Sequence, residues 1–212
     1  MWDDWLLDTL ALWARQAAAL IRYLLGEQSK SNAPPVLVGA GVGGWLALLI
    51  ASARPELTSG IVGLAADPDF TEDLLMANLT EEQKKQIMEQ GSQDIRWGNR
   101  WYPISRALIE DGRDNLLLGG PIETGCPVTI LQGQRDDAVP WRHALRLVDC
   151  LALDDVVLTL IKDGDQPVVR QHAEGRIILG QAEAQVAAVQ AVVVETIQVL
   201  LTAVLEEQVV LE

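Results

Sequence analysis

The sequence predicts an α/β fold in which a parallel sheet of about four strands is flanked by helices and a long helix closes the chain. Short apolar runs bounded by Gly, Pro or Asp alternate with helical patterns along the chain, and this alternation is typical of layered α/β folds. The chain has 212 residues, of which 49% are hydrophobic. This is enough to bury one core, so we expect a single domain over residues 1–212.

An amphipathic helix is predicted first, over residues 1–26. Trp, Leu and Ala recur there at spacings of three and four residues, which places them on one helix face. Gly26 and the polar run after it end this helix.

Four short apolar runs follow and are predicted to be buried parallel strands, because fully buried strands are apolar on both faces. They cover 36–38, 60–65, 128–131 and 156–161. Helical patterns lie between and after them, at 44–53, 71–89, 105–111, 141–151 and 175–206. We expect a core over residues 34–166, with a cap segment at about 70–104.

The charge and composition exclude several classes of function. The net charge is −14, so the surface would repel nucleic-acid phosphates. The most apolar stretch, 186–205, is interrupted by Gln and Glu and is expected to be a buried helix, not a membrane span. The two Cys and two His show no metal-ligand or disulfide spacing, so we expect no metal and no cofactor. Without a visible targeting signal, a reducing compartment is predicted, either the cytoplasm or the mitochondrial matrix.

A glycine-rich turn at 39–44 follows the first predicted strand and precedes a helix. Its Gly39, Gly41 and Gly44 match the spacing of a dinucleotide- or phosphate-binding turn. Gly39, Gly41 and Gly43 also match the register of a Gly-x-Ser-x-Gly nucleophile elbow, with Gly41 in the place of the serine. A third interpretation is that the glycines only let the helix pack closely on the strand.

Further motifs decide between these interpretations. They are Gly43-Gly-Trp45, Asp67-Pro-Asp-Phe-Thr-Glu-Asp73, Gln132-Gly-Gln-Arg-Asp-Asp-Ala-Val-Pro140 and Lys162-Asp-Gly-Asp165. In combination, they resemble one branch of the α/β-hydrolases. This branch comprises bacterial serine hydrolases and a mitochondrial palmitoyl-protein thioesterase and acyl-glucuronide esterase. The resemblance covers about residues 36–166.

The resemblance implies a degenerate catalytic triad. The nucleophilic serine of the family falls on Gly41, and the acid falls on Asp136. The general base falls on Gln166, whose amide cannot take up a proton. The backbone N–H of Val42 corresponds to one oxyanion-hole donor. The resemblance therefore predicts a catalytically inactive protein, a pseudoenzyme or an engineered derivative, and not an enzyme.

The family's layout also predicts an open sheet edge. The family's early strands would precede residue 34, and the chain is expected to be N-terminally truncated relative to that layout. The strand at 36–38 then becomes an edge, and an apolar edge associates unless it is covered. We therefore predict a protein partner or self-association, with the chain serving as a scaffold or as a subunit of an assembly. The interface candidates are the tryptophans, a residue type enriched in binding hot spots: Trp2, Trp5, Trp13, Trp97 and Trp101.

Two alternatives stay open. One is a dinucleotide- or phosphate-binding protein that uses the turn at 39–44. The other is residual ester or thioester hydrolysis, because an oxyanion hole and substrate binding alone can accelerate a reaction about 10³- to 10⁴-fold over water. His143, on a predicted helix, is expected to be a surface residue.

Overall fold

The computed structural model describes residues 9–25, 34–97, 100–152, 155–164, 170–171 and 177–178. The chain divides into two compact units, Met1–Val168 and Val169–Glu212, where the sequence predicts one domain. In the second unit, β7 (Arg170–Gln171) and β8 (Ile177–Ile178) pair antiparallel. The predicted helix at 175–206 lies outside the described residues except at 177–178, where the structure has a strand instead.

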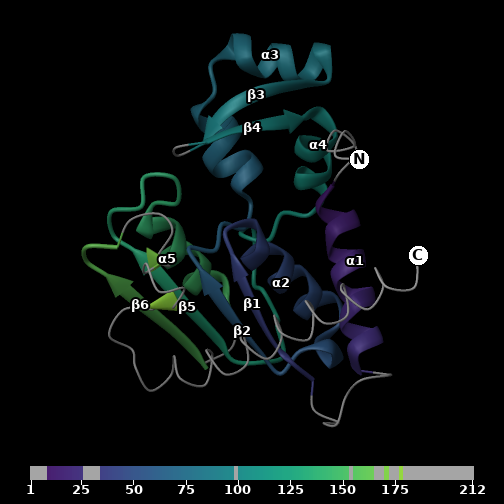
Figure 1. Cartoon of the computed structure of the whole chain (residues 1–212), viewed down its shortest axis with the longest axis vertical. Helices are drawn as coiled ribbons and strands as arrows, with labels where there is room; N and C mark the ends of the chain where they lie inside the picture. Colours follow the sequence, from purple (N-terminus) through teal and green to yellow (C-terminus); the bar gives the residue numbers. More distant parts are fainter. Residues whose placement is uncertain are drawn as a thin grey trace, which may run out of the picture. The chain divides into compact units, whose positions relative to one another are not determined.

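The first unit contains a four-stranded parallel sheet in the order β1-β2-β5-β6 (Figure 1). Its strands are Val36–Ala40, Gly60–Leu64, Val128–Gly133 and Val156–Ile161. All three pairings are parallel, and each strand coincides with one of the four predicted apolar runs. The predicted fold class, a parallel sheet of four strands flanked by helices, is confirmed.

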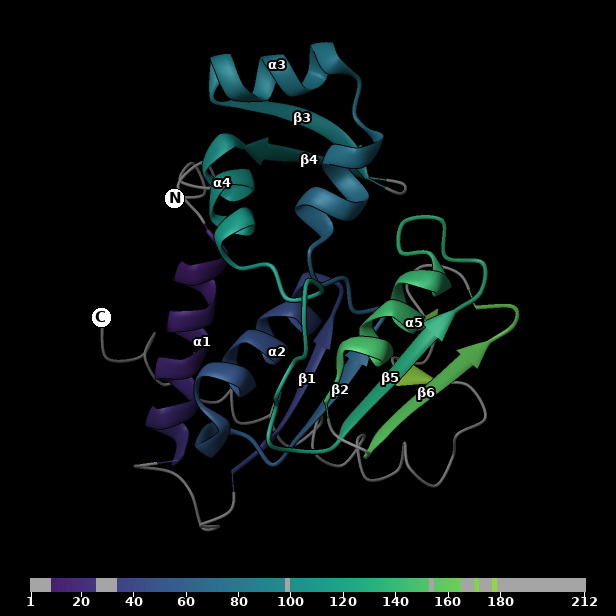
Figure 2. The same ribbon diagram turned by 180° about the vertical axis from the view of Figure 1, so that it is seen from behind.

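Helices α2 (Val42–Ala53) and α5 (Trp141–Cys150) pack on the same face of this sheet (Figure 2). Both helices contribute small or aliphatic side chains to one buried cluster with the central strands β2 and β5. The cluster includes Ala47, Leu48, Ala51, Ile61, Val128, Ile130, Ala144 and Leu147. Val128 and Ile130 are two residues apart on β5, and Ile61 is the register partner of Val128 on β2. The three side chains therefore point to one side of the sheet.

Helix α1 (Leu10–Tyr23) packs along α2. The Thr9 side chain accepts the Leu12 N–H at 3.2 Å, and the carboxylate of Asp111 accepts the Ala11 N–H at 2.9 Å. Two side chains thus satisfy amides that have no partner within the helix. The predicted helix is confirmed over these residues, and residues 1–8 lie outside the described part. No helix that the structure describes is long and apolar enough to cross a bilayer.

A cap lies between β2 and β5 in the chain and beyond the carboxyl ends of the parallel strands (Figure 2). It contains a π-helical turn, a 3₁₀ turn, α3, β3, β4 and α4, at Thr71–Leu75, Met76–Asn78, Glu81–Gln90, Ser92–Trp97, Arg100–Ser105 and Arg106–Asp114. Strands β3 and β4 form an antiparallel hairpin that the sequence does not predict. The sequence signal is short: only residues 94–97 of β3 alternate polar and apolar side chains, and Pro103 interrupts β4.

Candidate active site

Strand β1 turns sharply into α2 at Gly41, which has φ +53° and ψ −124°. The turn is tight because helix and strand are in contact: a β-carbon added to Gly39 would lie 2.2 Å from the carbonyl carbon of Gly43. The Gly41 N–H donates to the carbonyl oxygen of Leu64 at 3.0 Å and fixes the turn to β2. This strained strand-to-helix turn is the geometry of a nucleophile elbow.

Asp67, just after β2, lies against this elbow. A β-carbon built on Gly41 would be 3.4 Å from Oδ2 of Asp67, an ordinary contact distance. The Asp67 side chain is only 4% exposed, and within the described part of the chain its Oδ1 accepts no hydrogen bond. Burial raises the pKa of Asp67 well above its ordinary value of 3.8, and the nearby carboxylate of Asp136 raises this pKa further.

Asp136, at the predicted acid position, lies in the loop after β5 and is buried. Its Oδ1 accepts the N–H groups of Ala138 and Val139, both at 2.9 Å. The buried amide of Gln132 donates to the carbonyl oxygen of Val139 at 2.9 Å. These bonds hold the loop that carries Asp136, the acid loop (134–140), in one conformation.

The predicted base position, Gln166, lies outside the described residues. The loop that leads toward it is attached to the acid loop through residues 161–164. Arg135 donates its N–H to the carbonyl oxygen of Gly164 at 2.9 Å, and its guanidinium lies 2.8 Å from the carboxylate of Asp163. A β-carbon on Gly133 would lie 2.4 Å from the Gly164 carbonyl oxygen, so these two loops are in direct contact.

Asp69 anchors the cap to this edge of the sheet. It is 3% exposed and adopts φ +61°. Its two carboxylate oxygens accept the N–H groups of Leu117 and Leu118 at 2.7 and 2.8 Å. The segment that carries Asp67 is thereby held to the loop after α4.

His143 is buried, so the expectation of a surface residue is wrong. Its side chain is 7% exposed, and Nε2 lies 2.7 Å from the Pro68 carbonyl oxygen. The helix pattern predicts α5 correctly, but His143 lies on the face that packs against the segment after β2. This contact fastens α5 to the residue next to Asp67.

The stabilising contribution of the buried, neutral His143 is predicted to decrease in mild acid. Burial lowers the pKa of this imidazole below 6.5 in the folded state, so the unfolded chain binds the proton more readily. The stabilisation is fully present above about pH 6.5 and decreases as the pH falls toward the folded pKa. The raised pKa values of Asp67 and Asp69 act in the opposite direction, so the quantity to measure is the difference between two proteins. Urea unfolding between about pH 7.5 and 5 should show that the unaltered chain loses stability relative to His143→Gln as the pH falls. Equal losses in both proteins would contradict this assignment.

The glycines of the turn have structural explanations that do not involve a phosphate. A β-carbon on Gly44 would lie 2.5 Å from the β-carbon of Ala66, so Gly44, like Gly39, permits close packing. The carboxyl group of Asp67 lies beside the turn and is influenced by the charge of Asp136, and negative charge there would repel a pyrophosphate. The geometry therefore favours the elbow over the phosphate-binding interpretation of Gly39, Gly41 and Gly44.

The tryptophans predicted to form an interface differ in their surroundings. Trp101, on β4, is 69% exposed, whereas Trp13, on α1, is half-buried. Trp2 and Trp5 lie outside the described residues, and the structure does not describe the side chain of Trp97. Of the five, Trp101 is the one that the structure shows as an exposed aromatic surface.

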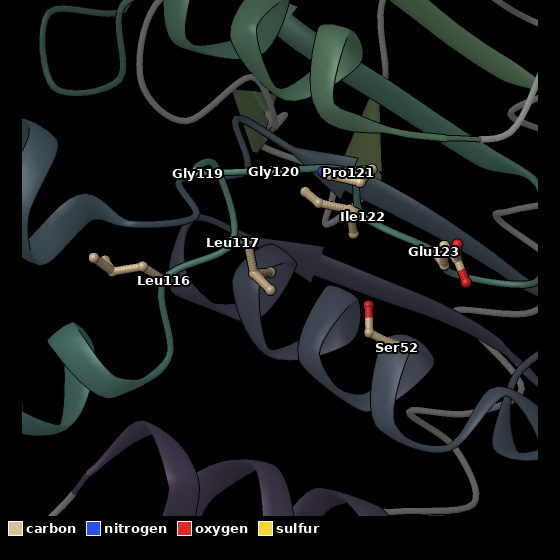
Figure 3. Close-up of a pocket in the computed structure, with 8 residues that line it drawn as sticks. All are labelled: Ser52, Leu116, Leu117, Gly119, Gly120, Pro121, Ile122 and Glu123. Atoms are coloured by element: carbon tan, nitrogen blue, oxygen red, sulfur yellow. The ribbon is translucent and has the colours of Figure 1, made fainter.

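A shallow cavity of about 430 Å³ lies away from the elbow, between α2 and the loop after α4 (Figure 3). It is lined by Ser52, Leu116, Leu117, Gly119, Gly120, Pro121, Ile122 and Glu123. Ser52 is about 15 Å from the start of α2 at 1.5 Å per helical residue. Within the described ranges, no group of three or more His, Cys, Asp or Glu residues could hold a metal ion.

A parallel sheet, an elbow at the end of a strand, a buried acid after a later strand and a cap beyond the carboxyl edge together define the α/β-hydrolase class. The crystal structure of a hydrolase-like protein from Agrobacterium vitis S4 has 38% sequence identity and a TM-score of 0.69 over 76% of this chain and 62% of that chain. The chain belongs to the α/β-hydrolase superfamily. No protein-family model matches it.

Within the superfamily, the chain is related to the mitochondrial thioesterase branch. Palmitoyl-protein thioesterase ABHD10, mitochondrial, of Homo sapiens is 30% identical over 81% of this chain and 55% of the relative. The Mus musculus protein of that name is 35% identical over 64% and 46%. The mouse structure of alpha/beta hydrolase domain-containing protein 10 has 30% identity and a TM-score of 0.62 over 74% of this chain and 62% of that chain. The chain spans about half the length of the curated relatives it matches.

These relatives correct the prediction that the chain is not an enzyme. They are named as thioesterases, which contradicts that prediction. The prediction relied on the residues at the nucleophile and base positions, Gly41 and Gln166, and on the expected truncation of the family's early strands.

Proposed function

We propose that the chain is an acyl-ester or acyl-thioester hydrolase in which water attacks the acyl carbon directly, without an acyl-enzyme. The observation that carries this proposal is the elbow at Gly41, which lies against the buried carboxyl of Asp67. Glycine offers no oxygen to acylate, so the attacking oxygen must come from water. The N–H of Val42, at the N-terminus of α2, is suited to stabilise the oxyanion that forms.

We propose a long-chain acyl thioester as the substrate class. The support is the name of the mitochondrial relatives, palmitoyl-protein thioesterase. A thioester also suits a site without a nucleophilic serine, because a thiolate is a better leaving group than an alkoxide. The same relatives support a mitochondrial location, which fractionation of cells that express the natural protein would test.

The test is thiol release from a palmitoyl thioester of a small thiol by the purified chain. We expect turnover about 10³- to 10⁴-fold above the uncatalysed rate, the acceleration that serine proteases retain without their triad. This turnover should resist a fluorophosphonate, because residue 41 carries no hydroxyl, whereas any contaminating serine hydrolase would be inhibited. A rate equal to that in buffer, or one that the fluorophosphonate abolishes, would contradict the proposal.

We also propose that the edge of β1 binds a strand of another polypeptide. In the described part of the chain, β1 pairs with β2 alone and is the last strand of the sheet. An edge strand offers unpaired N–H and C=O groups for such pairing. Light scattering over a range of concentrations, with Val38→Lys as the edge-blocking control, tests self-association. A constant monomer mass for both proteins argues against a second copy as the partner.

A further inference from the structure

The geometry points to Asp67 as the general base that activates water at the elbow. This inference rests on the proposed function and names the residue that performs its chemical step. Asp67 does not correspond to any of the three positions that the family resemblance assigns to a triad. It is identified by its place beside Gly41, where a nucleophilic side chain would otherwise begin.

The space beside Gly41 is suited to a water molecule. A serine at this position would extend from a β-carbon 3.4 Å from Oδ2 of Asp67, and glycine leaves that volume to solvent. Within the described part of the chain, Oδ1 of Asp67 accepts no hydrogen bond although the residue is 96% buried. A buried acceptor without a donor is costly, and a bound water would supply the donor.

The carboxyl is also held firmly. The carbonyl oxygen of Asp67 accepts the N–H of Phe70 at 3.1 Å, and the backbone N–H of Asp67 donates to the Gly41 carbonyl oxygen at 3.4 Å. The next residue, Pro68, is fixed through its carbonyl oxygen to His143. Bonds on both sides of the residue therefore limit how far the carboxyl can move from the elbow, as a general base requires.

Asp67 is better placed for this role than Asp136. Oδ1 of Asp136 already accepts two backbone N–H groups that hold its loop, so this oxygen is engaged in structure. The pKa of Asp67 is raised well above its ordinary value, mainly by burial and further by the charge of Asp136. A base with a raised pKa removes a proton from water more readily.

The step balances as a hydrolysis. The carboxylate of Asp67 takes one proton from water as the water oxygen bonds to the acyl carbon, and the carbonyl electron pair moves onto the oxyanion at the Val42 N–H. The oxyanion then collapses, the carbon–sulfur bond breaks, and the thiolate receives the proton from Asp67. The products are a carboxylic acid and a thiol, and Asp67 is again ionised.

The first test compares Asp67→Asn with Asp149→Asn in the thioester assay. Asp149 lies on α5 and is exposed, so it controls for the loss of one charge. Because a general base contributes about 10²- to 10⁴-fold, we expect Asp67→Asn to lose at least about 100-fold in turnover and Asp149→Asn to match the unaltered chain. Turnover by the unaltered chain should also rise with pH through the raised pKa of Asp67. Comparable activity in both variants, or turnover independent of pH between about 4 and 8, overturns the assignment while leaving the proposed function intact.

The second test does not need turnover. Gly41→Ser places a hydroxyl beside Asp67, and a base there should promote reaction of that serine with a fluorophosphonate. We expect labelling of Gly41→Ser and at least about 100-fold slower labelling of Gly41→Ser combined with Asp67→Asn. Equal labelling of the two proteins overturns the role of Asp67. If the unaltered chain shows no turnover but labelling depends on Asp67, the proposed hydrolysis fails and the placement of the base stands.

Discussion

Gly39→Ala is expected to destabilise the fold by about 3 kcal/mol or more. The new β-carbon would lie 2.2 Å from the carbonyl carbon and oxygen of Gly43 and 2.5 Å from the Gly44 nitrogen. All three atoms belong to the backbone of α2, so no side chain can move aside to make room. Either the helix shifts away from β1 or the elbow opens. Urea unfolding followed by circular dichroism measures the loss.

Gly43→Ala is the matched control, because it adds the same methyl group four residues later. No atom lies within 4 Å of a β-carbon on Gly43, which is in the first turn of α2. Since alanine is favoured over glycine in helices by up to about 1 kcal/mol, this variant should be equally or slightly more stable than the unaltered chain. Similar losses in both variants would show that α2 does not pack on β1 as described.

Trp45→Ala is the second large effect, with an expected loss of about 3 to 5 kcal/mol. Trp45 is fully buried. Its ring meets Phe70 edge to face, with centroids 5.9 Å apart and planes at 89°. The indole Nε1 donates to the carbonyl oxygen of Asn115 at 3.2 Å. One side chain thus joins α2 to the start of the cap and to the end of α4.

Trp45→Phe separates packing from hydrogen bonding. It keeps most of the ring volume and leaves the Asn115 carbonyl oxygen without the indole donor, so a smaller loss of about 1 to 2 kcal/mol is expected. Thermal unfolding of the two variants should preserve this order. If Trp45→Phe lowered the free energy of unfolding as much as Trp45→Ala, the indole hydrogen bond would contribute more to stability than the burial of the ring.

The parallel sheet could be predicted because each strand is short, continuously apolar and bounded by turn residues. The elbow at Gly41 and the loop that carries Asp136 could also be located, because the motifs of the family resemblance place them after the first and third strands of the sheet. The hairpin β3–β4 was not predicted, although residues 94–97 alternate polar and apolar side chains. Pro103, a residue type that is rare within strands, concealed its partner strand β4.

The surroundings of single polar residues were the least predictable feature. The burial of His143 depends on its contact with Pro68, which is 75 residues away in sequence. The meeting of Asp67 with Gly41 depends on the register between β1 and β2. Asp67 follows the second strand, and the sequence identifies it only as the first residue of a motif that carries the family resemblance. The incorrect expectation of an inactive protein followed from judging the site by its triad positions alone.

The backbone conformation at residue 41 affects which residues can replace one another there during evolution. A glycine codon of the form GGY becomes a serine codon, AGY, by one nucleotide change, and a β-carbon at this residue meets only an ordinary contact. A serine fits the space of this turn, although its side chain would bear the backbone strain of φ +53°. Lineages of this domain can therefore pass between a serine and a glycine at the elbow by a single mutation, and we expect both residues among its orthologues.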